Sequence, residues 1–467
     1  MKKRLISLIL MALMALSCAL AEETGNVPLM AYYECFAVPL GENALFEIPN
    51  EWGYQTSDAA DVPPMTSLLT DQNQMVMAMK LPADWEATDA SDALGIQSFI
   101  VEGTALMLGL TTPQSTRLQE MTINDMPAVL VEMNGQGFDI LWIGDSGDLY
   151  FFLFPNDDDA LVQQMIAVAQ SLCVFHRKGE QVNPASDFAY TADGGEVTIT
   201  DYIGTSEHVL IPDAIDGLPV TALADKAFYE KTVTTVVVPD SVTQIGDLCF
   251  SGDNYLVSLK LPDGLAELPY GALESCFRLI DFDLPQGLKK ISAGVLQYNC
   301  YLTHLTLPSS LTEIEQLNFI GLYGLQSLTL AEDNAAFKLD ETNGLLMTAD
   351  GTRLLHCFSD IVPAEEIILP EGLKTVDPFA FHYDYDVKRI VLPEGVETIG
   401  AMAFAMCPNL TEIVIPASVT DIGVMDGLDG RTGIISYKGN VIVTPEGCPA
   451  WNWAVETGAT VKSPEEN

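Results

Sequence analysis

The fold of this chain is decided by the stretch Val391-Leu392-Pro393-Glu394-Gly395-Val396-Glu397-Thr398-Ile399-Gly400-Ala401-Met402-Ala403-Phe404. A short apolar segment ends at a proline, and apolar residues then follow at fixed intervals. The same arrangement returns with prolines 23 residues apart, at 239, 262, 285 and 308 and again at 370, 393 and 416. A period in the range of roughly 20 to 50 residues is typical of solenoids, in which each repeat forms one coil that stacks on the next.

Within each repeat, apolar residues keep a fixed register relative to the proline, at positions +3, +6, +11, +17, +20 and +22. In the repeat that begins at Pro393, these residues are Val396, Ile399, Phe404, Leu410, Ile413 and Ile415. The alternation at +20 and +22 predicts a short strand with two side chains that point inward. The next proline ends this strand because it has no N–H to donate to the ladder. Glycine at +7 is expected to permit a tight corner, and it occurs as Gly246, Gly400 and Gly423.

This repeat pattern resembles the BspA-type leucine-rich-repeat family of bacterial surface proteins, over residues 190–462. Residues 190–212 resemble the opening hairpin of the family, and residues near 332–347 resemble its insertion. Residues near 445–462 resemble its closing cap, in which Trp451 and Trp453 would seal the last coil. The resemblance implies a solenoid at 188–462 with a parallel strand ladder. It also implies extracellular binding or adhesion, and it implies no reaction.

Residues 26–175 lack this period and predict a separate α+β domain, with an antiparallel sheet and helices. Strands are predicted at 44–48, 75–81, 127–133, 138–143 and 149–154, and helices at 91–110 and 157–172. The domain loosely resembles the PsbP/DcrB-like domains of exported proteins, through Ile48-Pro49 with Trp52, Asn124-Asp125-Met126-Pro127-Ala128, and Ser171-Leu172. The polar residues 176–187 form the predicted linker to the repeats.

Residues 1–21 have the pattern of a signal peptide. Lys2, Lys3 and Arg4 precede the apolar run 5–16, and Ala19-Leu20-Ala21 offers small residues for cleavage before Glu22. The alternative is a lipoprotein signal, in which Cys18 after Leu16-Ser17 would carry the lipid. Simple cleavage is favoured, because Ala15 stands where lipoprotein signals usually carry a larger aliphatic residue. The mature protein is therefore expected to be secreted or held at the cell surface.

The chain is strongly acidic, with 65 Asp+Glu against 21 Lys+Arg and a formal net charge of −44. Such a surface repels phosphate backbones, so nucleic acid is not an expected partner. It keeps a secreted protein dispersed, and it could instead attract a basic partner or divalent cations. We favour the first interpretation. No second apolar stretch is long enough to span a bilayer, so the mature chain is expected to lack a transmembrane segment.

Motifs that carry chemistry are scarce, and the sequence predicts no catalytic, cofactor-binding or metal-binding residues. Gly144-Asp145-Ser146-Gly147 resembles the nucleophile segment of chymotrypsin-like proteases. The general-base histidine of that family lies upstream, whereas the first histidine here is His176, so a hairpin turn is favoured. Asp157-Asp158-Asp159 could bind a cation, but an acidic helix start is the favoured interpretation. The eight cysteines left after cleavage form no CxxC pair, so buried thiols are expected.

One surface of the repeats is patterned, because positions +19 and +21 point outward from the predicted strand. We expect these residues to form a continuous exposed stripe that binds an extracellular protein or glycan. They are Ser258, Lys260, Asp281, Asp283, His304, Thr306, Ser327, Thr329, Arg389, Val391, Glu412 and Val414. The alternative for each residue alone is a merely solvated strand position. The leading hypothesis is a non-catalytic binding or adhesion protein, and the second is an envelope structural or assembly protein that binds the cell's own surface.

Overall fold

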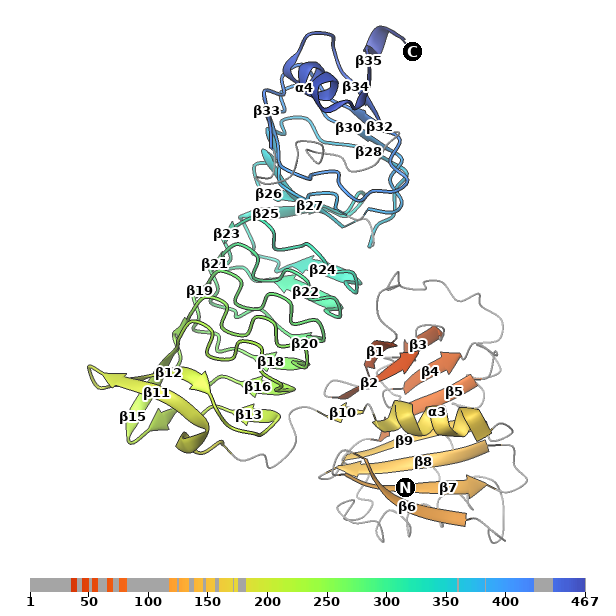
Figure 1. Ribbon diagram of the computed structural model, residues 1–467, viewed down its shortest axis with the longest axis vertical. Helices are drawn as coiled ribbons and strands as arrows, with labels where there is room; N and C mark the ends of the chain where they lie inside the picture. Colours follow the sequence, from red (N-terminus) through yellow and green to blue (C-terminus); the bar gives the residue numbers. More distant parts are fainter. Residues whose placement is uncertain are drawn as a thin grey trace. The chain divides into compact units, whose positions relative to one another are not determined.

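The chain divides into two compact units, residues 1–181 and residues 182–467. The first unit carries antiparallel strands and the second carries the repeats (Figure 1). The computed structural model describes residues 35–39, 44–49, 53–57, 65–69, 75–81, 117–123, 126–133, 138–145, 148–155, 159–170, 172–174, 182–358, 361–382, 384–423 and 440–466.

A seven-stranded antiparallel sheet dominates the first unit, in the order β3-β4-β5-β9-β8-β7-β6. Its strands are β3 (Gly53–Ser57), β4 (Met65–Leu69), β5 (Met75–Leu81), β6 (Arg117–Ile123), β7 (Met126–Met133), β8 (Phe138–Asp145) and β9 (Asp148–Pro155). A smaller sheet joins β1 (Cys35–Pro39), β2 (Ala44–Pro49) and β10 (Cys173–Val174), and helix α3 (Asp159–Gln170) packs against β9 and β2. Alternate residues of β9 are buried, as expected of a strand with one covered face; they are Tyr150, Phe152 and Phe154.

The five strand segments expected from the sequence coincide with β2, β5, β7, β8 and β9, and the helix expected at 157–172 is α3. Five further strands, β1, β3, β4, β6 and β10, were not expected, because they are short or their apolar residues alternate too weakly to predict a strand. The helix expected at 91–110 lies outside the described residues. The α+β class of this unit therefore stays a prediction.

The repeats of the second unit form stacked coils, and each coil contributes one strand to each of two ladders (Figure 1). The unit opens with η1 (Ala185–Asp187), β11 (Phe188–Asp193), β12 (Glu196–Tyr202), β14 (Ala214–Ile215) and β15 (Leu218–Leu223). The first ladder continues through β13 (His208–Leu210), β16 (Thr235–Val237), β18 (Ser258–Lys260), β20 (Asp281–Phe282), β22 (His304–Leu307) and β24 (Ser327–Leu330). The second holds β17 (Gln244–Ile245), β19 (Glu267–Leu268), β21 (Lys290–Ile291) and β23 (Glu313–Ile314). The outward side of the first ladder, at positions +19 and +21, is called the strand face.

The inserted residues form β25 (Phe337–Asp340), β26 (Leu345–Thr348) and β27 (Arg353–Cys357), and the coils then resume. The first ladder continues as β28 (Glu366–Ile368), β30 (Arg389–Val391), β32 (Glu412–Val414), β34 (Val441–Val443) and β35 (Thr460–Lys462). The second ladder continues as β29 (Thr375–Val376), β31 (Thr398–Ile399) and β33 (Asp421–Ile422). Helix α4 (Pro449–Thr457) and the turn η2 (Pro464–Glu466) end the unit. The parallel strand ladder predicted for the repeats is confirmed.

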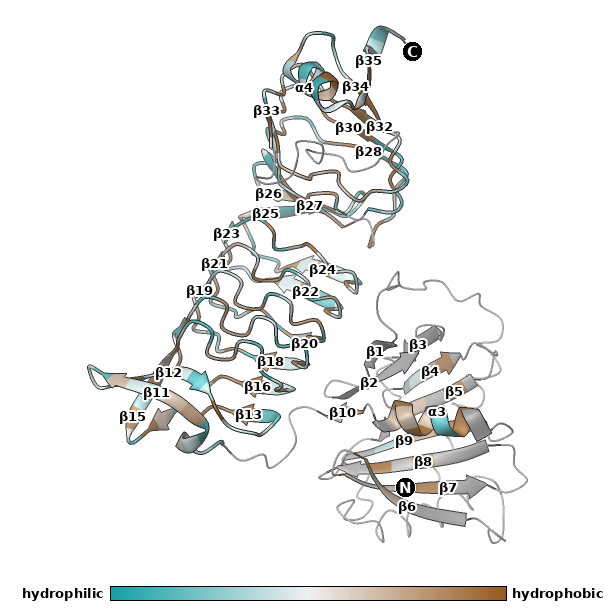
Figure 2. Cartoon of the chain, in the orientation of Figure 1, coloured by the Kyte–Doolittle hydropathy of each residue, from teal (hydrophilic) through white to brown (hydrophobic). Residues whose placement is uncertain are grey.

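Apolar side chains at the predicted register positions are buried inside the coils. Hydrophobic and hydrophilic residues alternate along each coil (Figure 2). Phe250 and Phe404, both at +11, are 0% and 1% exposed. Their rings pack against those of the preceding coil, with centroids 5.2 Å apart for Phe228 and Phe250, which are stacked, and 5.3 Å apart for Phe381 and Phe404, which are tilted. The apolar side chains of each coil are therefore shielded from water by the neighbouring coils.

Polar side chains at +14 bond one coil to the one before it. The thiol of Cys276 donates to the carbonyl oxygen of Phe250 at 3.1 Å, and that of Cys407 donates to Phe381 at 2.8 Å. The Nδ2 of Asn299 donates in the same way to Leu273 at 3.1 Å. The expectation of buried thiols is confirmed for five free cysteines, Cys249, Cys276, Cys300, Cys357 and Cys407, and is wrong for Cys448, which is half-buried. Burial raises the pKa of the Cys276 thiol well above its ordinary value, so it is inert.

The glycines at +7 permit close stacking, and the prediction that they form a tight corner is wrong. A Cβ on Gly246 would lie 2.2 Å from the backbone nitrogen of Asp225 in the preceding coil, and Gly400 is equally crowded. The corner lies at +9, where the backbone of Leu248 (φ 55°) and Met402 (φ 57°) is left-handed. Glycine is needed where two backbones approach, and the left-handed corner tolerates larger residues because the surrounding stack fixes it.

The hairpin formed by β26 and β27 is a wall between two hydrophobic cores. Successive side chains of a strand point to opposite faces. Leu346 and Leu355 join the core of the coils before the wall, whereas Leu345 and Leu354 join the core of the coils after it. The boundary that the wall makes between the two cores is called the seam. The sequence predicted an insertion at this place, and the structure shows that it joins the two halves of the array.

Two sets of side chains tie the seam together. Arg353 donates to both carboxylate oxygens of Asp377 at 2.7 Å each, and its Nη1 donates to the carbonyl oxygen of Ile314 at 3.3 Å. The ring of His356 lies against Phe319 and Phe358, with centroids 5.8 Å and 4.8 Å away. One guanidinium and one aromatic cluster therefore connect the coil before the wall to the wall and to the coil after it.

The closing helix α4 covers the last coil mainly through small residues. Ala450 and Ala454 are fully buried, and Trp453 packs against the core from a half-buried position. Trp451 is half-buried but is not among the residues packed against this core. The predicted sealing role is therefore confirmed for Trp453 and wrong for Trp451, because one turn of helix presents Ala450, Trp453 and Ala454 to the coil.

Loss of a stacked ring should destabilise the array. We expect Phe404→Ala to lower the free energy of unfolding by about 3–5 kcal/mol, because removal of the ring leaves a cavity in a fully packed core. Ile203→Ala is the control, since Ile203 is 57% exposed and its loss should stay within about 0.5 kcal/mol. Urea unfolding measures both. Equal effects of the two substitutions would contradict the assignment of +11 to the core.

The histidines near the seam should make the protein sensitive to acid. Burial lowers the pKa of His356 to about 3 and of His382 to about 4, against an ordinary value of 6.5. As the pH falls below 6.5 towards these values, the unfolded chain binds protons that the folded chain does not bind, so the free energy of unfolding falls. We expect His356→Gln to reduce this loss in urea unfolding over a pH series.

The matched control is His304→Gln, because His304 is exposed on the strand face. This variant should keep the pH dependence of the parent protein. A pH dependence that His356→Gln leaves unchanged would show that His356 does not titrate between the folded and unfolded states as proposed.

Candidate binding surface

Two rows of side chains run along the strand face, because the parallel strands pair in register. His304 pairs with Ser327 and Thr306 with Thr329 before the seam. Arg389 pairs with Glu412 and Val391 with Val414 after it. The residues singled out at +19 and +21 are therefore neighbours on adjacent strands.

Most of these residues face solvent before the seam. Exposed are Lys260, Asp283, His304, Thr306 and Thr329, and Ser327 is half-buried. Ser258 is only 1% exposed, and its neighbour Thr235 is 2% exposed. The prediction that Ser258 belongs to an exposed stripe is wrong, because the +19 row begins as a buried polar row at this end of the ladder. The side chain of Asp281 lies outside the described residues.

Hydroxyl groups and an imidazole form the open part of the strand face. The Oγ1 atoms of Thr306 and Thr329 lie 2.8 Å apart, and Oγ1 of Thr303 lies 2.8 Å from Nδ1 of His304. A hydroxyl can donate one hydrogen bond and accept others, so each threonine keeps capacity for a further partner. These groups can bind a polar ligand without first giving up an ion pair.

The charged residues of the +19 row pair with one another after the seam. Arg389 donates from Nε to Glu412 at 2.7 Å and from Nη1 to Glu366. Nζ of Lys462 lies 3.0 Å from the other oxygen of Glu412. The hydrogen bond from Arg389, followed by that from Lys462, lowers the pKa of Glu412. We call Glu366, Arg389, Glu412 and Lys462 the charge ribbon, and its members already satisfy one another.

The +21 row is apolar on the first three strands after the seam, β28, β30 and β32. Ile368 is 62% exposed, and its neighbours in register, Val391 and Val414, are half-buried. We call these three side chains the apolar row. It lies beside the charge ribbon, so this half of the strand face offers an apolar strip with fixed charges next to it.

The strand face is interrupted, so the prediction of one continuous stripe is wrong. Its strands form three sheets, β13-β16-β18-β20, β22-β24 and β28-β30-β32-β34-β35. The first interruption lies between β20 and β22. Their coils remain hydrogen-bonded directly, since the N–H of Tyr301 donates to the carbonyl of Phe277 at 3.2 Å. The other interruption is the seam, where the inserted residues follow β24. The seam divides a polar surface from an apolar, ion-paired one.

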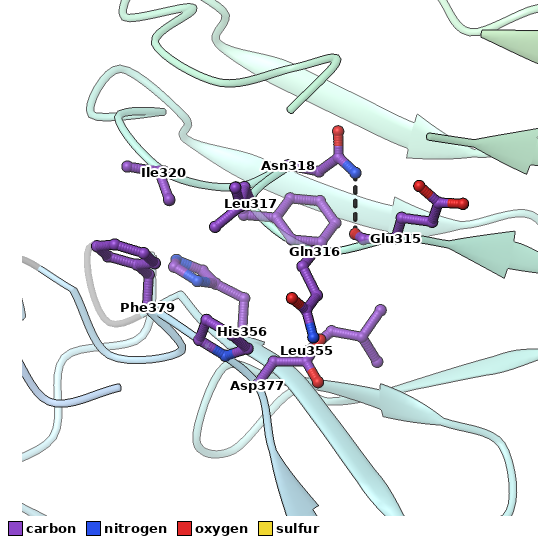
Figure 3. Close-up of a pocket in the computed structure, with 11 residues that line it drawn as sticks. Glu315, Gln316, Leu317, Asn318, Ile320, Leu355, His356, Asp377 and Phe379 are labelled. Carbon is purple, nitrogen blue, oxygen red and sulfur yellow. Dashed lines mark hydrogen bonds between the residues drawn. The ribbon is translucent and has the colours of Figure 1, made fainter. Parts of the chain in front are cut away.

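A small pocket opens at the seam (Figure 3). Residues 315–320 line one side, and Leu355, His356 and residues 377–379 line the other. His356 points towards Phe379 in this view, and Asp377 is held by Arg353. Burial favours the neutral imidazole of His356. The sequence could not indicate this pocket, because its two sides meet only through the wall.

The structure bears on the predicted absence of catalytic and metal sites at only a few places. Among the residues that the structure describes, no group of three or more His, Cys, Asp and Glu could hold a metal ion. Strands β8 and β9 pair down to Asp145 and Asp148, which makes a hairpin of the segment that resembles a protease motif. Ser146, Asp157 and Asp158 lie outside the described residues. In the described part of the chain, no helix is long and apolar enough to cross a membrane.

Comparisons with known proteins agree with this architecture. Residues 221–340 and 355–425 match the family model "BspA type Leucine rich repeat region" in 6 copies. No curated protein matches the sequence.

Several solved structures are similar to parts of the chain. A leucine-rich-repeat protein of T. pallidum is 23% identical, with a TM-score of 0.30, and the match covers 60% of this chain and 98% of that one. A leucine-rich cell surface protein of Faecalibacterium prausnitzii is 18% identical, with a TM-score of 0.38, and the match covers 62% and 96%. Cyanobacterial PsbP from Synechocystis is 13% identical, with a TM-score of 0.24, over 33% and 99%.

The matched segments contain the stacked coils on both sides of the seam, with the 23-residue register and the parallel ladder described above. Over this array, at residues 221–340 and 355–425, the chain carries leucine-rich repeats of the BspA type.

Proposed function

We propose that this is an exported, non-catalytic surface protein that binds another protein through the strand face before the seam. The observation that carries the proposal is the open row His304, Thr306 and Thr329, whose side chains are exposed and, among the described residues, are engaged by no ion pair. Repeat arrays of this kind commonly use such a surface for a partner. The family match supports a repeat-based binding or surface protein.

A glycan is the alternative ligand for the same surface, because hydroxyls and an imidazole hydrogen-bond sugars as well as peptides. The acidic composition disfavours nucleic acid. Export rests on the signal-like residues 1–21, with lipid attachment at Cys18 as the alternative route to the surface. The N-terminal unit is proposed to be a PsbP/DcrB-like α+β domain that acts as an anchor or a second contact.

A second candidate function is envelope assembly, in which the partner belongs to the cell's own surface. The apolar row beside the charge ribbon favours it, because an apolar centre with a polar rim is typical of stable protein interfaces. The two candidates use different halves of the strand face, so substitutions on each half distinguish them.

The test is surface binding of residues 22–467 to immobilised extracellular-matrix proteins, mucin glycans and cell-wall material, at low and high salt. A variant with His304→Ala, Thr306→Ala and Thr329→Ala removes the open row. We expect it to weaken binding to one matrix protein by about tenfold or more, since it removes several hydrogen bonds from one interface.

The control carries Asp240→Ala and Glu394→Ala, two exposed carboxylates just beyond the ends of strands. It should bind like the parent protein. Binding to cell-wall material alone, unaffected by the triple substitution, would overturn the proposal and favour envelope assembly. Binding to mucin glycans alone would replace the protein partner by a glycan.

A further inference from the structure

Strand β28 has one bonded edge and one open edge. The N–H of Arg389 donates to the carbonyl of Glu365 at 3.1 Å, and the N–H of Leu369 donates to the carbonyl of Val391 at 2.9 Å. Backbone groups of successive residues in a strand point to opposite sides. The N–H and C=O groups of Glu366 and Ile368 therefore point away from β30, towards the seam. Within the described residues, β28 pairs with β30 alone.

Strand β13, at the start of the first ladder, shows how this protein closes an edge. On β13, the N–H of Leu210 donates to Oδ1 of Asn183 at 2.8 Å, and its carbonyl accepts from the N–H of Asn183 at 3.0 Å. The N–H of His208 donates to Oγ of Ser206 at 3.2 Å. The described residues contain no comparable bond to the open edge of β28. An uncovered edge is a template for another strand.

The residues at this edge are exposed as well as unbonded. Ile368 is 62% exposed, and Glu366 is exposed too. Two rows of the strand face end here, the charge ribbon at Glu366 and the apolar row at Ile368. A strand added in parallel would extend both rows, and it would place one side chain beside Glu366 and another, two positions later, beside Ile368.

The chemistry of the two rows decides which side chains fit. The charge ribbon alternates in sign through Glu366, Arg389 and Glu412. The next position is favourable for a basic residue and unfavourable for an acidic one, since opposite charges stabilise a cross-strand pair and like charges destabilise it. The apolar row continues best with a β-branched apolar residue. The net charge of −44 and the exposed Glu371 after the strand also favour a basic segment.

We propose that the open edge of β28 binds an extended segment of a partner protein by strand addition, and that this segment carries a basic residue and a β-branched apolar residue two positions apart. Main-chain hydrogen bonds then supply affinity, and the two side chains supply specificity. The proposal rests on the proposed protein-binding function, because it names the kind of segment bound. It concerns an edge that the strand-face substitutions before the seam leave intact.

The test uses the full mature chain, residues 22–467, and a fluorescent peptide of about nine residues, long enough for one strand. The peptide has arginine, threonine and isoleucine at its centre and threonine on both sides. Two further peptides carry N-methyl groups, either on the arginine and isoleucine or on the residues between and beside them. We expect saturable binding of the parent peptide, measured by fluorescence anisotropy.

Only one of the two methylated peptides should lose binding, because a strand bonds to one edge through alternate residues. In the proposed parallel arrangement, methylation of the residues between and beside the arginine and isoleucine abolishes binding, and methylation of the other set leaves it. Equal effects of both methylation patterns would overturn the proposal, since charge attraction alone does not distinguish them.

The matched substitution in the protein is Ile368→Pro. It removes an N–H that points away from β30, so the bonds between β28 and β30 remain. We expect peptide binding to weaken by about tenfold or more, with an unchanged midpoint of thermal unfolding. Ile368→Thr is the control, because it keeps the N–H and the β-branched shape, and it should retain most of the binding.

The preference of the protein for an arginine peptide over a glutamine peptide is a second readout. It does not require that the fold tolerates Ile368→Pro. Glu366→Gln should bring the affinities for the arginine peptide and for its glutamine analogue together, whereas Glu394→Gln should leave the preference for arginine intact. Absence of saturable binding, or an arginine preference that Glu366→Gln does not change, would overturn the proposal. If the strand-face triple variant binds the peptide normally but no matrix protein, the edge and the strand face are separate sites.

Discussion

Every coil of this array depends on the coil beside it. A coil of one repeat has no second layer of its own, so rings such as Phe250 and Phe404 are covered only when the next coil stacks on them. The polar groups obey the same rule, because Asn299 and Cys407 bond to carbonyls of the preceding coil. Stacking at a fixed period also sets side chains of equal position side by side, and the rows of the strand face follow directly from it.

The insertion changes what this repetition produces. It places a hairpin wall between two cores, with Leu346 facing one core and Leu354 the other. Stacking continues through the wall, but the strands of the first ladder do not pair across it, so β28 begins a new sheet. One interruption therefore creates the two chemically different halves of the strand face, the pocket at the seam and the open edge of β28.

The period of the sequence was sufficient to predict the solenoid, the core positions and the rows at +19 and +21, because all three repeat with the backbone. It was not sufficient for Ser258, whose burial depends on what lies around it at the start of the ladder, or for Gly246, whose role depends on the approach of the preceding coil. The alternating charges of Arg389 and Glu412, one repeat apart, were a visible signal for the charge ribbon. The seam pocket and the open edge follow from the pairing of the inserted hairpin, which no spacing in the repeats encodes.

The wall is tested most directly by hydrogen–deuterium exchange on two substitutions in the same hairpin, Leu346→Ala and Leu354→Ala. We expect Leu346→Ala to speed exchange mainly in β18 to β23, whose core it faces, and Leu354→Ala to speed it mainly in β28 to β32. Both side chains are fully buried, so the two losses of protection should be similar in size. They should occur on opposite sides of the wall. Equal loss of protection on both sides of the seam for each substitution would contradict a wall that separates two stacked cores.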